Sequence, residues 1–194
     1  MKHNNSILYN KIHTQSKRLL MRPYKLTDFT RCMVSKSNRL SKVSVFDEEI
    51  STLSGNTYSE FKQRVEMQRK HGKMRVHFVL ALFDKKSDEF VGQIDLFVIN
   101  KQLRWVNLGY QIHNQYWGKG FATEAAFLAQ KLAFTQLDVY RVEAATELKN
   151  KAAIKVAKKS GMLYEGKRIK FFPDNGGVDM VVYGANAIDF KYVI

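Results

Sequence analysis

The chain has 194 residues, of which 45% are hydrophobic and 26% are charged, and its formal net charge is +14 at pH 7. This composition is typical of a globular protein with one packed core and excludes an intrinsically disordered chain. The single cysteine, Cys32, excludes an internal disulfide and a cysteine-based metal cluster. We therefore expect no metal site and a cytoplasmic location.

Residues 1–16 are polar and lack the apolar run of a signal peptide, and no apolar run in the chain reaches the roughly 18 residues of a membrane span. We expect a polar N-terminal extension over residues 1–16, one domain over residues 17–194, and no membrane partner. The positive charge attracts polyanions. Because the lysines are dispersed and no nucleic-acid motif is present, we expect no direct nucleic-acid site.

The first half of the chain is predicted to form one strand, two helices and three further strands. The strand covers residues 17–23 and ends at proline, and a helical pattern follows over residues 26–35. A second helix begins at the capping box of Thr57 and Glu60 and is expected to end at Gly72. Three apolar runs, at 75–83, 90–99 and 104–113, are separated by short polar turns and predict an antiparallel meander.

The second half is predicted to alternate helices and strands. Apolar residues at three- and four-residue spacing predict a helix over 121–136. A strand over 140–146, a helix from Asn150 to Gly161, and a hairpin of 162–172 and 178–184 around a turn at 173–177 follow. The order predicts an α+β fold with helices on a mixed, mostly antiparallel sheet. The helical crossover allows the strands on either side of it to run parallel.

Two glycines, Gly118 and Gly120, flank Lys119 where the third meander strand gives way to a helix. The first N–H groups of a helix lack carbonyl partners, and the helix dipole adds about half a positive charge there. Glycines let the backbone curl closely around a phosphate, and the lysine adds a positive charge. The pattern indicates an anion-binding loop, with an ordinary tight turn as the alternative. Its spacing excludes a Walker loop and a complete dinucleotide fingerprint.

The stretch Gln115-x-x-Gly118-x-Gly120, followed by Ala-Thr-Glu-Ala at 122–125, resembles the pyrophosphate-binding loop of the GNAT superfamily of acyl-CoA N-acyltransferases. The resemblance covers residues 17–183 and includes Leu-Gly-Tyr at 108–110. The chain is most similar to the RimJ/RimL-type branch, which acetylates protein N-termini, including those of ribosomal proteins. The resemblance implies a twisted, mostly antiparallel sheet in which one splayed strand pair forms a wedge for CoA.

The resemblance also implies a set of cofactor contacts. Acetyl-CoA would place its pyrophosphate on the amides of residues 118–122 and its pantetheine arm along residues 111–113, and Asn150 would hydrogen-bond the arm. The expected cofactor-binding residues are Gln111, Ile112, His113, Gln115, Gly118, Lys119, Gly120, Phe121, Ala122 and Asn150. The amine pocket would lie between the two N-terminal helices, the loop at 37–56 and the closing hairpin.

The catalytic side chains are not specified by the sequence. Relatives often carry a tyrosine, a serine and an acid at positions that hold Ala157, Ala153 and Asn107 here. The enzyme would then work by positioning its reactants, or the protein would bind CoA without much turnover. As general base we consider Asp95, His113 and Glu143, each with a structural role as the alternative, and we interpret Glu124 as structural because it suits the helix dipole.

We therefore expect an N-acetyltransferase that moves the acetyl group of acetyl-CoA to a primary amine by direct attack in a ternary complex. The expected acceptor is a protein or peptide N-terminal α-amine, for example on a ribosomal protein. The basic surface disfavours a polycation such as spermidine. The alternatives are an acetyltransferase of a small-molecule amine, a non-catalytic CoA-binding protein, and a nucleic-acid-binding module supported only by net charge. Monomer and homodimer both remain open.

Overall fold

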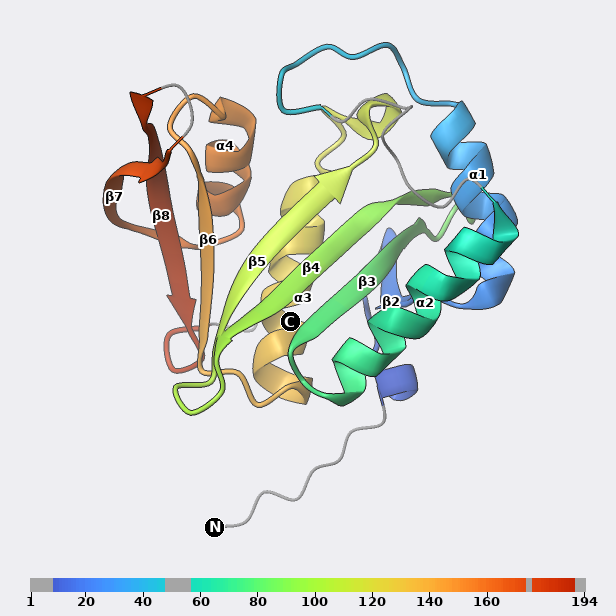
Figure 1. The fold of residues 1–194 in the computed structure, drawn as a ribbon, viewed down its shortest axis with the longest axis horizontal. Helices are drawn as coiled ribbons and strands as arrows, with labels where there is room; N and C mark the ends of the chain where they lie inside the picture. Colours follow the sequence, from blue (N-terminus) through green and yellow to red (C-terminus); the bar gives the residue numbers. More distant parts are fainter. Residues whose placement is uncertain (1–8, 48–56, 174–175, 191–194) are drawn as a thin grey trace.

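The computed structural model describes residues 9–47, 57–173 and 176–190, and it shows one twisted sheet between two layers of helices (Figure 1). The eight strands of the sheet lie in the order β1-β2-β3-β4-β5-β6-β8-β7. Every neighbouring pair is antiparallel except β5 and β6. The strands are β1 (Thr14–Gln15), β2 (Leu19–Pro23), β3 (His77–Asp84), β4 (Phe90–Asn100), β5 (Trp105–Ile112), β6 (Arg141–Glu147), β7 (Leu163–Phe172) and β8 (Val178–Asn186).

The helices divide between the two faces of the sheet (Figure 1). The 3-10 turns η1 (Tyr9–Lys11), η2 (Leu26–Asp28) and η4 (Asn114–Tyr116) accompany the α-helices α1 (Phe29–Ser37), α2 (Tyr58–Lys73), α3 (Phe121–Gln136) and α4 (Lys151–Lys159). One core lies under α1 and α2 and includes Phe61 and Val65, and a larger core lies under α3 and α4 and includes Leu132 and Ala157. The α+β fold expected from the sequence is therefore confirmed.

The alternation of side chains along β4 and β5 decides which residues face the site. Ile94 and Leu96 of β4, like Leu108 and Ile112 of β5, belong to the core under α3. Because successive side chains of a strand point to opposite faces, the residues between them face the α1/α2 side. This front face carries Gln93, Asp95, Phe97, Asn107, Gly109 and Gln111.

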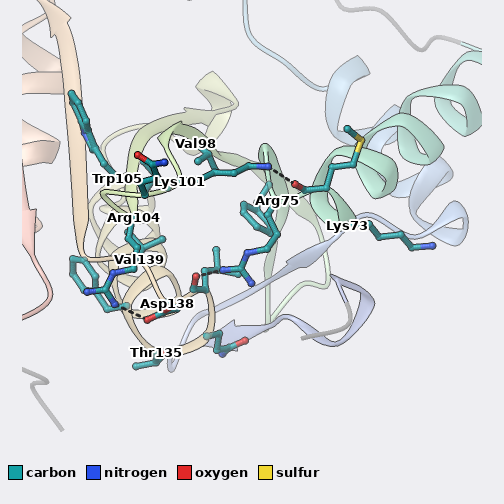
Figure 2. Close-up of a pocket in the computed structure, with 16 residues that line it drawn as sticks. Lys73, Arg75, Val98, Lys101, Arg104, Trp105, Thr135, Asp138 and Val139 are labelled. Atoms are coloured by element: carbon teal, nitrogen blue, oxygen red, sulfur yellow. Dashed lines mark hydrogen bonds and ion pairs between the residues drawn. The ribbon is translucent and has the colours of Figure 1, made fainter. Parts of the chain in front are cut away.

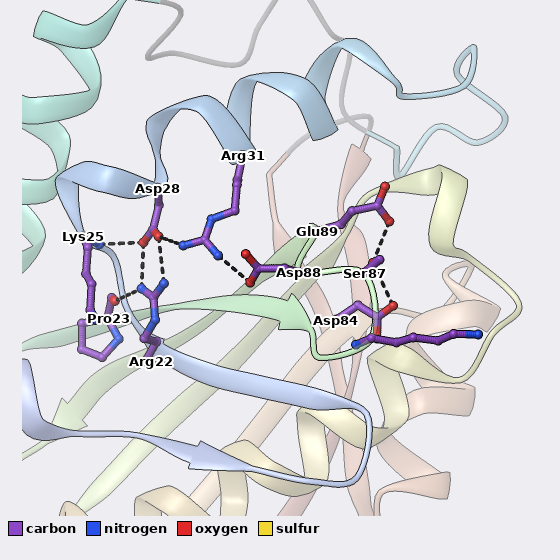
Figure 3. A network of polar contacts seen from close by, with 10 residues as sticks. Arg22, Pro23, Lys25, Asp28, Arg31, Asp84, Ser87, Asp88 and Glu89 are labelled. Carbon is purple, nitrogen blue, oxygen red and sulfur yellow. Dashed lines mark hydrogen bonds and ion pairs between the residues drawn. The ribbon is translucent and has the colours of Figure 1, made fainter.

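A network around Asp28 fixes the start of α1 to the sheet (Figure 3). The buried carboxylate accepts two hydrogen bonds from Arg22, at 2.7 and 2.8 Å, and one from Arg31 at 2.6 Å. Burial by itself raises the pKa of Asp28, but the hydrogen bonds from Arg22 and from the Lys25 backbone outweigh it and lower the pKa. Arg31 also pairs with Asp88 in the β3–β4 turn at 2.6 Å. The front-face helix is thereby anchored beside the site.

Most predicted elements agree with the structure to within a few residues, and the capping box is present: Thr57 Oγ1 accepts from the Glu60 N–H at 3.2 Å. The sequence predicted that Gly72 would end this helix, but α2 continues to Lys73. Gly72 instead makes room for Tyr9, since a Cβ there would lie 2.2 Å from the Tyr9 ring.

The N-terminal segment is more closely packed than its polar composition predicts. Tyr9 and Ile12 are only 3% and 1% exposed and belong to the core, and β1 pairs with β2. The described residues 9–16 of the expected extension therefore pack as part of the fold. Residues 1–8, part of the loop expected to line the amine pocket (48–56), and two residues of the predicted hairpin turn (174–175) lie outside the described residues.

Candidate functional site

Strands β5 and β6 separate after a short paired segment. They pair at three positions only, Trp105 with Arg141, Val106 with Val142 and Asn107 with Glu143. Beyond this point β5 remains paired with β4 as far as Ile112, and β6 remains paired with β8 as far as Glu147. The diverging arrows are visible in Figure 1. We call the splayed edges, residues 108–112 of β5 and 144–147 of β6, the wedge, and Asn107 with Glu143 its apex.

The open edge of β5 presents backbone groups at alternate residues. The N–H of His113 donates to the Val91 carbonyl of β4 at 3.0 Å. In an antiparallel ladder the backbone N–H and C=O groups of every second residue face the same neighbouring strand. Those of Gln111 therefore also face β4, whereas the N–H groups of Tyr110 and Ile112 face the wedge. Of the three residues expected to present their backbone to the pantetheine arm, only Ile112 has its N–H on that side.

The wedge leads into the glycine loop. Gly118 has φ 75° and Gly120 has φ 81°, and Gly120 is the N-cap of α3. No heavy atom lies within 4 Å of the position that a Gly118 Cβ would take, so the left-handed backbone and not crowding requires glycine there. Glu124 is the residue whose N–H bonds to the Gly120 carbonyl, at 3.1 Å. The N–H groups of residues 121–123 therefore lack acceptors within their helix and can bind an anion.

Arg18, in the turn between β1 and β2, supports this loop. Its Nη1 donates to the Lys119 carbonyl at 2.9 Å, and its Nε donates to Glu124 Oε2 at 2.7 Å. The guanidinium also lies 4.9 Å from the centroid of the Phe121 ring. Glu124, which further accepts from the Ser16 hydroxyl, braces the loop as expected. Arg18 lies about a hundred residues from the motif in sequence, so no local pattern could identify it.

Two expected cofactor contacts are engaged in holding the surrounding structure. Gln115 Nε2 donates to the Ser35 carbonyl of α1 at 2.8 Å, which ties the loop to the front-face helix. Asn150 Oδ1 accepts from the Ala153 N–H at 3.0 Å and thereby caps α4. The amide nitrogen of Asn150, which has no partner among the described residues, is the atom available to an arm in the wedge.

The three base candidates differ in what surrounds them. His113 faces α1, with Nδ1 2.8 Å from the Ser35 hydroxyl and its ring against Phe90. Burial, with a smaller contribution from nearby Arg39, lowers the pKa of His113 to about 4. The neutral, buried imidazole therefore joins the end of β5 to α1 and does not point into the wedge.

Glu143 lies at the apex, and its charge is balanced by two arginines. Glu143 is 5% exposed. Its carboxylate pairs with Arg168 of β7 at 2.5 Å and with Arg141 at 3.4 Å. Each carboxylate oxygen of Glu143 is thus engaged by a guanidinium group. The sequence did not decide which way Glu143 faces, and the structure places it against the β7–β8 hairpin.

Asp95 lies on the front face of β4, where its strand neighbours are Val79 and Gly109. Its Oδ1 is 2.9 Å from Nε2 of His77, and its Oδ2 accepts from Gln93 Nε2 at 3.1 Å. His77 comes from β3, and the sequence pattern did not identify it. Asp95 is thus the candidate that lies near the apex without an arginine partner among the described residues.

A separate cavity of about 710 Å³ lies at the other end of β5, between the ends of α2 and α3 and the β4–β5 turn (Figure 2). Its rim carries four cations, and several of them serve the surrounding structure. Arg75 donates to the Leu137 carbonyl, Lys101 Nζ donates to the Met74 carbonyl at 3.0 Å, and Arg104 pairs with Asp138 at 2.9 Å. These contacts stabilise helix ends and a turn away from the glycine loop.

Comparison with known proteins decides the family. The acetyltransferase (GNAT) domain matches residues 18–163, which is most of the chain. The chain belongs to the GNAT family. The enzyme class expected from the sequence, an acetyl-CoA-dependent N-acetyltransferase, is thereby confirmed. No helix among the described residues is long and apolar enough to cross a membrane.

Several relatives indicate the range of acceptors within the family. The probable N-acetyltransferase YjcK of Bacillus subtilis is 27% identical over 84% of this chain and 90% of its own length. The spermidine N(1)-acetyltransferase of Escherichia coli is 35% identical over 45% of this chain and 47% of its own length. A ribosomal-protein-S5-alanine acetyltransferase from Vibrio fischeri shares the fold, with a TM-score of 0.71 and 20% identity over 93% of this chain and 99% of that one.

Proposed function

We propose that this GNAT enzyme transfers the acetyl group of acetyl-CoA to the α-amine of a protein or peptide N-terminus. The observation that carries the proposal is the continuity of the site: the wedge, which the N–H groups of Tyr110 and Ile112 face, leads to a glycine loop at a helix N-terminus. One extended carrier with a diphosphate and an amide-rich arm fits both parts.

The cofactor would lie along β5. The diphosphate is bound by the N–H groups of residues 118–122, and Lys119, whose ammonium lies 5.4 Å from the Tyr116 ring, supplies a positive charge. The arm runs down the wedge past Ile112 and Tyr110, with the amide nitrogen of Asn150 on the other side. The thioester then lies near the apex, on the front face of the sheet.

The chemistry needs few side chains. The neutral amine nitrogen attacks the thioester carbonyl carbon, a C–N bond forms, and the C–S bond breaks. CoA leaves as a thiolate, and the proton lost by the amine nitrogen passes through water to this thiolate. A backbone N–H on the open edge of β5 polarises the carbonyl oxygen. Holding both reactants in place contributes about 7 to 11 kcal/mol to lowering the barrier. This route is compatible with the alanines at 153 and 157, of which Ala157 is buried in the core.

The acceptor class rests on charge and on the relatives. Arg168 of β7 pairs with Glu143 of β6 and places a basic side chain beside the front face. A polycation would be repelled by the net charge of +14. The E. coli spermidine enzyme favours a small polyamine as the second candidate, because its 35% identity is the highest of the relatives described above.

Release of free CoA tests the proposal. The purified chain is incubated with acetyl-CoA and, in turn, with peptides bearing a free N-terminus, the same peptides with a blocked N-terminus, and spermidine. We expect CoA release only with free N-termini. Release with spermidine alone would establish the second candidate, and tight binding of acetyl-CoA without release from any amine would make the chain a non-catalytic CoA-binding protein.

A further inference from the structure

The front face near the apex carries two carboxylates, and only one of them is paired with arginines. Glu143 is paired with Arg141 and Arg168, whereas the bonds of Asp95 go to a histidine and an amide. Among the described residues no lysine or arginine forms an ion pair with Asp95. In a chain with a net charge of +14, this carboxylate is a local negative centre beside the wedge.

Gly109 places no side chain between Asp95 and the wedge. The two residues are direct cross-strand partners, and Gly109 is the second residue of β5 beyond the apex. A Cβ on Gly109 would meet only the Asp95 Cβ, at an ordinary 3.4 Å, and its φ lies outside the left-handed region. Neither crowding nor backbone conformation therefore demands glycine. What its missing side chain provides is room on the front face between Asp95 and the open edge of β5, which lie about 5 Å apart, one strand spacing.

The carboxylate is held in a fixed orientation by neighbours on two strands. His77 of β3 contacts Oδ1, and its ring lies against Phe97 with centroids 5.7 Å apart. Gln93 donates to Oδ2 and in turn accepts from the hydroxyl of Tyr24 at 2.9 Å. Tyr24 is 3% exposed, so this chain of hydrogen bonds is anchored in the core under α1 and α2.

We propose that Asp95 is the ammonium-binding group of the acceptor site, and that Gly109 is the opening through which the acceptor amine reaches it. This inference rests on the proposed function. The acceptor arrives as a primary ammonium, pairs with Asp95 over Gly109, and is thereby placed on the front face beside the thioester. Its proton leaves to water at the carboxylate, which is about one-third exposed, before the nitrogen attacks. His77 and Gln93 are positioning residues.

The first test separates local charge from long-range charge. Asp95→Asn keeps the shape and removes one negative charge, and Asp138→Asn removes one from the exposed ion pair with Arg104 at the other end of β5. With the amine that gives the highest CoA release, we expect KM for the amine to rise at least tenfold in Asp95→Asn and to change less than twofold in Asp138→Asn. Acetyl-CoA affinity, measured by calorimetry, should stay within twofold in both.

The second test addresses the opening. Gly109→Ala and Gly109→Val add side chains toward Asp95, and we expect KM for the amine to rise in that order, by a larger factor than the Kd for acetyl-CoA. Asp95→Glu, which keeps the charge, should recover part of the affinity lost in Asp95→Asn. If wild type releases CoA and Asp95→Asn keeps the wild-type KM, this inference is wrong while the proposed function stands. If wild type releases no CoA with any amine, the proposed function fails first.

Discussion

Acid should destabilise this protein through one buried imidazole. His113 is 6% exposed, and burial lowers its pKa from 6.5 to about 4. The unfolded chain therefore binds a proton that the folded chain does not bind between these two values. Stability from the neutral His113 is complete above about pH 6.5 and is lost as the pH falls toward 4. Linkage gives a loss of about 2 kcal/mol between about pH 7 and pH 5 from this group alone.

Urea unfolding at several pH values measures the effect. His113→Gln removes the titrating group, so the difference in unfolding free energy between wild type and variant should shrink by about 2 kcal/mol over that range. His13→Gln makes the same substitution at an exposed position and is the matched control for effects of the change that do not depend on burial. If the difference in unfolding free energy between wild type and His113→Gln were the same at both pH values, the account of His113 as a buried, neutral imidazole would be wrong.

Three further changes test separate parts of the fold and the loop. Gly72→Ala places a methyl group against the Tyr9 ring and should destabilise by about 1 to 3 kcal/mol in urea, whereas in a Tyr9→Ala background it should stabilise because alanine favours the helix. Gly120 has a left-handed φ of 81°, so Gly120→Val should cost about 1 to 2 kcal/mol of stability and weaken acetyl-CoA binding in calorimetry. Unchanged affinity for acetyl-CoA would show that this loop is not part of the site. Arg168→Ala should cost about 1 to 3 kcal/mol by leaving the buried Glu143 to Arg141, more than Arg104→Ala at an exposed pair.

Local patterns in the sequence predict most of this architecture. The capping box at Thr57, the cap at Asn150 and the apolar spacing of 121–136 are short-range signals that helices obey. The two glycines of the loop are equally local, because their left-handed conformation is a property of the turn itself. Element boundaries and the glycine turn before α3 could therefore be predicted without knowing the packing.

The parts that could not be predicted depend on contacts between distant segments. Gly72 follows the pattern of a helix end, but the ring of Tyr9, 63 residues earlier in the chain, determines its role. The imidazole of His113 is directed to α1 by Ser35, and Arg18 reaches the loop from the turn between β1 and β2. His77 becomes relevant only when β3 and β4 are placed side by side. Such pairings follow from sheet register, which a single sequence does not specify.

The most direct measurement is a crystal structure of the protein grown with acetyl-CoA. We expect the diphosphate within hydrogen-bonding distance of the N–H groups of residues 118–122, the arm between β5 and β6, and the acetyl group on the front face near Asn107 and Gly109. Acetyl-CoA bound elsewhere, for example in the cavity between Arg75 and Arg104, with the wedge left vacant, would contradict the proposed site and the mechanism built on it.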